Sequence, residues 1–167
     1  MMTGILLLSF LLTGCGSQEP QTGKKMSMYY INTAETKVEV HEQYLNTKTL
    51  DEQLDETMRY LSTTPEKLEY KAPLDMGFRV LDYEVEDGKL LINVDKAYSE
   101  LSPTTEVLVR AAIVRTLTQL PNVKYVGITV EDSQLYDNAG EMVGWMNADQ
   151  FINNDGNEIN TYELVKV

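Results

Sequence analysis

Two segments joined by a two-residue turn occupy the middle of the sequence. Apolar residues recur at every second position of residues 81–85 and 90–94, and Asp87 and Gly88 stand between the two segments. An Asp-Gly pair favours the tight turn of a β-hairpin. Because every second side chain of a strand points to the same face, each segment presents an apolar face that has to be buried. The pattern predicts a hairpin covered on one face by another layer.

A first helix is predicted over residues 50–61. Thr49 and Glu52 have the spacing of a capping box, in which each side chain bonds to the backbone of the other residue. Apolar residues then recur at helical spacing until Pro65, which ends the pattern.

A second helix is predicted from Pro103 to Leu120, with Ser102 as its cap and Pro121 after its end. It is apolar on two sides, which is usual for a helix that is covered on both. One side consists of Val109, Ala112, Ile113, Leu117 and Leu120, and the other of Val107, Ala111 and Val114. The second side packs against the first helix or contacts a partner protein, so its three residues are candidate contact residues.

Further strands are predicted at residues 28–32, 37–45 and 126–130, with a short helix at 148–152 and a last strand at 161–167. The order strand, strand, helix, hairpin, helix, strand is typical of an α+β fold. We therefore expect a small mixed sheet with the two main helices packed on one face.

The N-terminus has the features of an export signal followed by a lipid anchor. Residues 5–12 are almost all apolar, but the run is shorter than the ~20 residues that span a bilayer and fits the core of a signal peptide. Leu12, Thr13 and Gly14 then precede Cys15, and the four residues resemble the lipobox of bacterial lipoproteins. The resemblance implies cleavage after residue 14 and a diacylated Cys15, whose two acyl chains anchor a protein stably in a lipid membrane.

Residues 15–26 are then expected to be the lipidated cysteine and a flexible tether. No Lys or Arg precedes the apolar run, although a positive start is usual for a signal peptide. An ordinary secretory signal and a buried N-terminal helix therefore remain as alternatives.

The charge of the chain and its shortage of reactive side chains exclude several kinds of function. A net charge of −12 repels phosphate backbones, so nucleic acid is not an expected partner. The chain has one histidine, His41, and one cysteine, so neither a nucleophile–base pair nor a transition-metal site is expected. We expect no cofactor and no catalysis.

Two acidic clusters are candidate sites. Asp51, Glu52, Asp55 and Glu56 stand in the first two turns of the first helix, where they are expected to face water and favour the helix dipole, although paired carboxylates also serve glycosidases. Residues 153–158 have a calcium-like composition, but the EF-hand spacing would place ligands on Phe151 and Tyr162, which cannot serve. A polar turn is expected there.

Residues 142–146 form an apolar stretch in an otherwise polar region, and Trp145 is the only tryptophan of the chain. Such a stretch either covers the core or presents an exposed anchor for another protein, a role in which tryptophan is common. Trp145 is therefore a further candidate contact residue.

Several strings of residues resemble the GerMN domain of lipoproteins from spore-forming and related Gram-positive bacteria. They are Tyr-Tyr-Ile-Asn at 29–32, residues 80–94, Asp-Lys-Ala-Tyr at 95–98, residues 113–123 and residues 126–130, of which 116–123 is the most specific. The resemblance covers residues 27–145 and leaves 146–167 as a C-terminal extension. It implies a fold similar to the ring-building domains of envelope assembly complexes, action through protein contacts, and no catalytic residue.

The resulting hypothesis is a lipoprotein on the extracytoplasmic face of the cell membrane that binds envelope proteins, in sporulation or germination, and is compatible with oligomer formation. The second hypothesis is a lipoprotein that binds a solute or a wall polymer, which would need a pocket lined by several aromatic side chains. An envelope hydrolase is the third.

Overall fold

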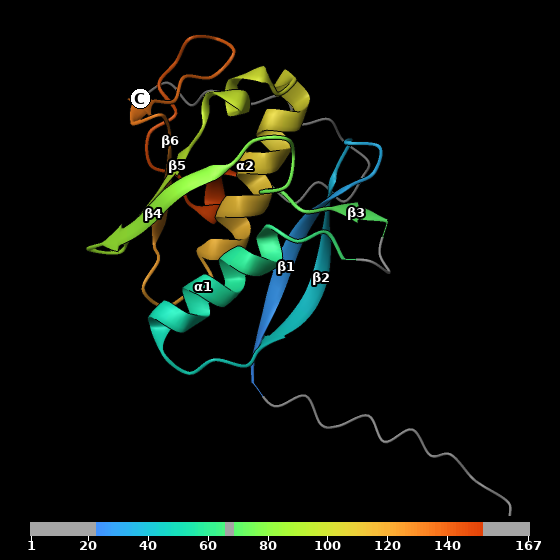
Figure 1. The fold of residues 1–167 in the computed structure, drawn as a ribbon, viewed down its shortest axis with the longest axis vertical. Coiled ribbons are helices and arrows are strands. Elements are labelled where there is room, and N and C mark those ends of the chain that lie inside the picture. Colours follow the sequence, from blue (N-terminus) through green and yellow to red (C-terminus); the bar gives the residue numbers. More distant parts are fainter. Residues whose placement is uncertain (1–22, 66–68, 152–167) are drawn as a thin grey trace, which may run out of the picture.

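The computed structural model describes residues 23–65 and 69–151 of the chain. These residues form an α+β fold, which confirms the predicted class (Figure 1). The strands divide between two sheets where the sequence predicted one. The two main helices do not form a layer on one face of a single sheet, because one of them lies between the two sheets (Figure 1).

The first sheet, called sheet A, has the strand order β2-β1-β3 and is antiparallel. Its strands are β1 (Lys24–Asn32), β2 (Val38–Leu45) and the two-residue β3 (Tyr70–Lys71), which the sequence pattern did not predict. β1 begins inside the segment that was predicted to be a flexible tether, because Lys24 and Lys25 pair with the end of β2 and Met26 is buried in the core. The folded domain therefore begins about three residues before its predicted boundary.

The second sheet, called sheet B, has the strand order β4-β5-β6-β7. It consists of β4 (Val80–Glu86), β5 (Lys89–Val94), β6 (Tyr125–Val130) and β7 (Ser133–Gln134). β4 and β5 form the predicted hairpin, and Asp87 and Gly88 have φ angles of 50° and 80°, as a type I′ turn requires. β5 and β6 are parallel, so a crossover has to connect them.

That crossover contains the short 3-10 helix η1 (Lys96–Glu100) and the helix α2 (Pro103–Leu117). Figure 1 shows α2 at the centre of the domain, in contact with β1 and β2 of sheet A and with β6 of sheet B. A helix in this position must be apolar on more than one side, which explains the two apolar faces in its sequence. The predicted cap is present, since Ser102 Oγ accepts a bond from the Thr105 N–H at 3.2 Å.

The second apolar side of α2 is not an open docking surface. Val114 is fully buried, Ala111 is 9% exposed, and Val107 alone of the three is half-exposed. The interior of the domain covers this side, so the interpretation of these three residues as partner contacts is corrected. They belong largely to the core that both sheets share with α2.

The other main helix, α1 (Leu50–Leu61), lies against α2, β1 and β2. Its capping box is formed as predicted: the Glu52 N–H donates to Thr49 Oγ1 at 3.3 Å and the Thr49 N–H donates to Glu52 Oε2 at 3.2 Å. The Tyr83 hydroxyl of β4 donates to Asp55 Oδ1 at 2.7 Å and so ties α1 to sheet B.

Side chains from the end of α2 close part of one edge of β1. β3 pairs with Ile31 and Asn32 only, so the earlier residues of that edge have no strand beside them in the described part of the chain. The Tyr29 N–H donates to Thr116 Oγ1 at 3.0 Å. The Ser27 N–H donates to Gln119 Oε1 at 3.0 Å, and Gln119 Nε2 donates to the Ser27 carbonyl at 2.7 Å. These bonds replace those that a neighbouring strand would make.

Candidate functional site

The face of sheet B that points away from α2, called the outer face, carries its side chains in three cross-strand rows. Each row begins with a carboxylate on β4 and crosses β5 to β6: Glu86, Lys89 and Tyr125; Glu84, Leu91 and Gly127; Asp82, Asn93 and Thr129. Because side chains alternate along β4, these acids lie on the outer face and the half-buried Tyr83 and Val85 lie on the other face of the strand. The outer face is therefore acidic along one border and partly apolar in its middle.

Trp145 packs on the middle row. A Cβ atom at Gly127 would lie 2.8 Å from Trp145 Cζ3 and 3.2 Å from Leu91 Cδ1, so the indole occupies the space that a side chain at 127 would need. Lys89 Nζ lies 5.5 Å from the ring centroid, within the range of a cation–π interaction. Trp145 nevertheless remains 43% exposed. An indole that is held in place and still faces water is suited to contact another molecule.

The segment that follows β7 runs back alongside β6 and so places Trp145 next to that strand. Val126 and Met146 exchange two backbone bonds of 2.8 Å each, which adds Met146 to the edge of β6. Met146 is 2% exposed and lies in the core, whereas Met142 is 59% exposed. Within the apolar stretch 142–146, Met146 thus covers the core and Trp145 is exposed on the outer face.

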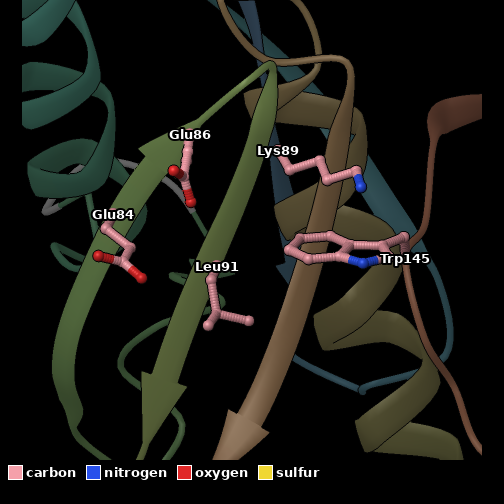
Figure 2. A pocket seen from close by; sticks show the side chains of 5 residues that line it. All are labelled: Glu84, Glu86, Lys89, Leu91 and Trp145. Carbon is pink, nitrogen blue, oxygen red and sulfur yellow. The ribbon is translucent and has the colours of Figure 1, made fainter.

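A hollow of about 270 Å³ lies on the outer face beside Trp145. It is lined by Glu84, Glu86, Lys89, Leu91 and Trp145, and Figure 2 shows the two carboxylates of β4 on one side of Leu91 and the indole on the other. The hollow has two carboxylate acceptors on its β4 side and the ammonium of Lys89 on the side of Trp145, so only its β4 side suits a group with a positive charge.

The third row forms a polar network around the buried Asn93. Asn93, which is 4% exposed, donates to Asp82 Oδ2 at 3.1 Å and to Asp132 Oδ1 at 2.8 Å, and its Oδ1 accepts from the Asp132 N–H at 3.0 Å. Glu131 and Asp132 have φ angles of 48° and 63°, which non-glycine residues rarely adopt. The network holds this turn between β6 and β7, so it supports the outer face from one end.

The acidic residues of α1 differ in their exposure to water. Asp51, Glu52 and Asp55 are exposed as predicted, but Glu56 is 7% exposed, which corrects the prediction that it faces water. Its Oε2 accepts bonds from the N–H groups of Asn46 and Thr47 at 2.9 and 3.1 Å and from the Thr47 hydroxyl at 2.7 Å. Burial raises the pKa of this carboxyl, but the bonds from Thr47 and Asn46 outweigh it and leave the pKa below its usual value. Glu56 therefore stabilises the loop before α1.

A second partly buried acid lies on α2. Glu106 and Arg110 form an ion pair of 2.6 Å with side chains only 12% and 11% exposed. The hydroxyl of the buried Tyr98 donates to Glu106 Oε1 at 2.9 Å, and burial followed by the charge of Glu106 raises the pKa of this phenol well above its usual value. These contacts link η1 to the first turns of α2.

The remaining predicted sites are placed as follows. His41 lies half-exposed in β2, opposite Met28 of β1. Within residues 23–65 and 69–151, no three His, Cys, Asp or Glu side chains are grouped to hold a metal ion, and no helix there is long and apolar enough to cross a membrane. Residues 12–15, the polar turn at 153–158 and the last strand predicted at 161–167 lie outside the described residues.

Sequence reasoning identified Trp145 but missed the four residues that surround it on the outer face. The alternation of β4 does indicate that residues 82, 84 and 86 share a solvent face. Nothing in the sequence of β4 and β5, however, indicates that Trp145, more than fifty residues further along the chain, packs over Gly127 beside them.

Comparisons with known proteins agree with this fold. Residues 27–136 match the family model Germane, described as sporulation and spore germination. The structure resembles the first GerMN domain of the sporulation protein GerM from Bacillus subtilis, with a TM-score of 0.53 and 15% identity over 71% of this chain and 91% of that one. It also resembles the tandem GerMN domains of the same protein, with a TM-score of 0.52 and 18% identity over 79% of this chain and 48% of that one.

This chain thus spans about half the length of the tandem-domain structure. At these identities the likeness shows the fold alone. No curated protein matches the sequence.

Proposed function

Because the chain belongs to the sporulation and spore germination family, we propose that it is a lipid-anchored, non-catalytic protein that contacts other envelope proteins outside the cell membrane. The observation that carries the proposal is Trp145, which packs over Gly127 on the outer face and stays 43% exposed. Fixed aromatic side chains surrounded by other contacts contribute most of the binding energy in many interfaces.

Another exposed apolar residue extends this face. Tyr125 begins β6 in the row of Glu86 and Lys89 and is 41% exposed. The hollow itself is lined by a single aromatic side chain. A pocket for a solute or a wall polymer would be lined by several, so contacts with proteins are favoured over this alternative.

The membrane anchor is proposed from Leu12, Thr13, Gly14 and Cys15. Since β1 begins at Lys24, residues 16–23 would connect the lipid to the domain. Eight residues extend to about 28 Å at most, so the domain would sit close to the membrane surface. Replacing Cys15 with Ser should release the protein from the membrane fraction into the medium, and retention of the variant would contradict the anchor.

The protein contacts are tested by crosslinking in intact cells. A photoreactive amino acid at position 145 should capture a defined envelope protein during sporulation or germination. The same amino acid at Val40, which is 51% exposed in sheet A, is the matched control and should not capture that protein. Capture of wall fragments alone at position 145 would favour polymer binding instead.

A further inference from the structure

β4 is a free edge of sheet B in the described part of the chain. Glu86 and Lys89 flank the type I′ turn and form a hydrogen-bonded pair, so the next such pair is Glu84 with Leu91. The N–H and C=O groups of Tyr83 and Val85 consequently point away from β5. No hydrogen bond from another described segment reaches them. The opposite border of sheet B, by contrast, is closed by β7 and Met146.

Only a short part of this edge can form hydrogen bonds with an added strand. The register between β4 and β5 shifts between Val80 and Asp82, which leaves Leu81 as the extra residue of a bulge. A bulge interrupts regular pairing on an edge. An added strand could therefore pair with residues 82–86 only, a length that suits a peptide segment of another protein.

The acidic side chains of β4 determine which peptide segments can pair with this edge favourably. Glu84 and Glu86 are exposed on the outer face, and neither forms an ion pair within the described residues. Opposite charges that face each other across neighbouring strands stabilise the pair, and like charges destabilise it. A lysine or arginine on an added strand would reach across β4 to the near side of the hollow, where Glu84 and Glu86 face its charge.

The same charges disfavour pairing of two copies through β4. In such a dimer the carboxylates of both edges would share a border, and the net charge of −12 on each chain adds repulsion. The other face of β4 carries the half-buried Tyr83 and Val85, which apolar residues of an added strand could cover. The edge thus favours a segment that alternates basic and apolar residues.

We propose that an extended segment of a partner protein, with Lys or Arg at alternate positions, adds to β4 as a further strand and places a basic side chain over Glu84 and Glu86, at the border of the hollow. This inference rests on the proposed function and names the chemistry of the partner. The bonds to Tyr83 and Val85 would supply affinity, and Glu84 and Glu86 would supply selectivity.

The test uses the full-length chain purified in detergent and a seven-residue peptide that alternates valine and lysine. Trp145 is the only tryptophan, so its fluorescence reports on the hollow directly. A saturable change in its emission is expected, with affinity roughly tenfold weaker for the Glu84→Gln/Glu86→Gln variant. The variant Asp75→Asn/Glu100→Gln removes as many charges from exposed positions elsewhere and should bind as the wild type does.

Two further peptides separate strand addition from simple charge attraction. The same peptide N-methylated at alternate residues keeps its charges but cannot form the strand bonds, so it should lose binding. A peptide with glutamate in place of lysine should not bind. Equal binding of either peptide, or an unchanged affinity of the Glu84→Gln/Glu86→Gln variant, would overturn the inference.

Failure of the inference can be distinguished from failure of the proposed function. If position 145 captures an envelope protein in cells but the basic peptide does not bind, the proposed function stands and strand addition at β4 is wrong. A dimer that is broken by Val85→Pro would assign the edge to a second copy and would also overturn the inference.

Discussion

The side-chain amide of Gln119 bonds to both the N–H and the C=O of Ser27, at 3.0 and 2.7 Å, although the two residues are 92 positions apart. A single side chain thus substitutes for one residue of a neighbouring strand. Thr116 accepts a bond from the Tyr29 N–H. The two side chains together give hydrogen-bond partners to backbone groups of β1 that have no partner in β3. Exposed edge groups of a strand are otherwise sites of unwanted pairing.

Replacing Gln119 with Leu should lower the free energy of unfolding by about 1–3 kcal/mol, because both backbone groups of Ser27 lose their partner. Urea unfolding measures this, and faster hydrogen exchange of the Ser27 N–H should accompany it. Gln134→Leu, on the exposed strand β7, is the matched control and should change stability by less than about 0.5 kcal/mol. Equal stability of the two variants would show that the Ser27 bonds contribute nothing.

Replacing Gly127 with Ala should displace Trp145. The new Cβ would lie 2.8 Å from Cζ3 of the indole, and overpacking of this kind costs about 1–3 kcal/mol. Tryptophan fluorescence should shift to longer wavelength as the ring moves into water, and the midpoint of urea unfolding should fall. In a Trp145→Ala background the same change should be neutral or slightly stabilising, because the clash is gone. A loss of stability in both backgrounds would mean that the indole is not what excludes a side chain at 127.

Replacing Glu56 with Gln should destabilise the domain at neutral pH. The pKa of Glu56 is lowered in the folded protein, so the charged carboxylate contributes stability that is present above its unfolded pKa. That stability is lost as the pH falls through the lowered folded pKa. The difference in unfolding free energy between wild type and variant should therefore be largest, about 1–3 kcal/mol, near pH 7 and should shrink below about pH 4.5.

The exposed Glu100 provides the control for this pH series. Glu100→Gln should leave the unfolding free energy close to that of the wild type across the same pH range. A difference for Glu56→Gln that stays constant down to pH 2 would show that the charge of Glu56 is not what stabilises the loop.

Replacing Tyr83 with Phe removes the bond to Asp55 that ties α1 to β4. Burial, followed by the hydrogen bond to Asp55, raises the pKa of Tyr83 to about 12. The folded protein therefore holds this proton more tightly, and the resulting stability is present below the unfolded pKa of about 10 and is lost as the pH rises toward 12. Absorbance titration of phenolate should show one fewer late-titrating tyrosine in Tyr83→Phe. An unchanged titration curve would contradict the assignment.

The local elements were predictable because their signals lie within a few residues of one another. The capping box at Thr49, the Ser102 cap followed by Pro103, and the Asp87–Gly88 turn are all present where the sequence placed them. Each of these features depends on short-range hydrogen bonds or on the conformational preference of one residue.

The features that the sequence did not predict depend on contacts between distant segments. The division into two sheets follows from α2, which both sheets cover. The two-residue strands β3 and β7 are too short to show a pattern. Glu56 is indistinguishable in the sequence from its exposed neighbours, and it is buried only because the loop at Asn46 and Thr47 folds over its carboxylate. The outer face likewise depends on the return of residues 145 and 146 to β6.

The central position of α2 also affects how the chain acquires its structure. β1 needs side chains at positions 116 and 119, and the parallel pair β5–β6 needs the whole crossover between them. Neither half of the polypeptide can complete its hydrophobic interior before the other arrives. Folding should therefore be a single cooperative event, slower than in proteins dominated by local contacts, and the N-terminal strand should be left with unsatisfied amides until nearly the whole domain has been synthesised.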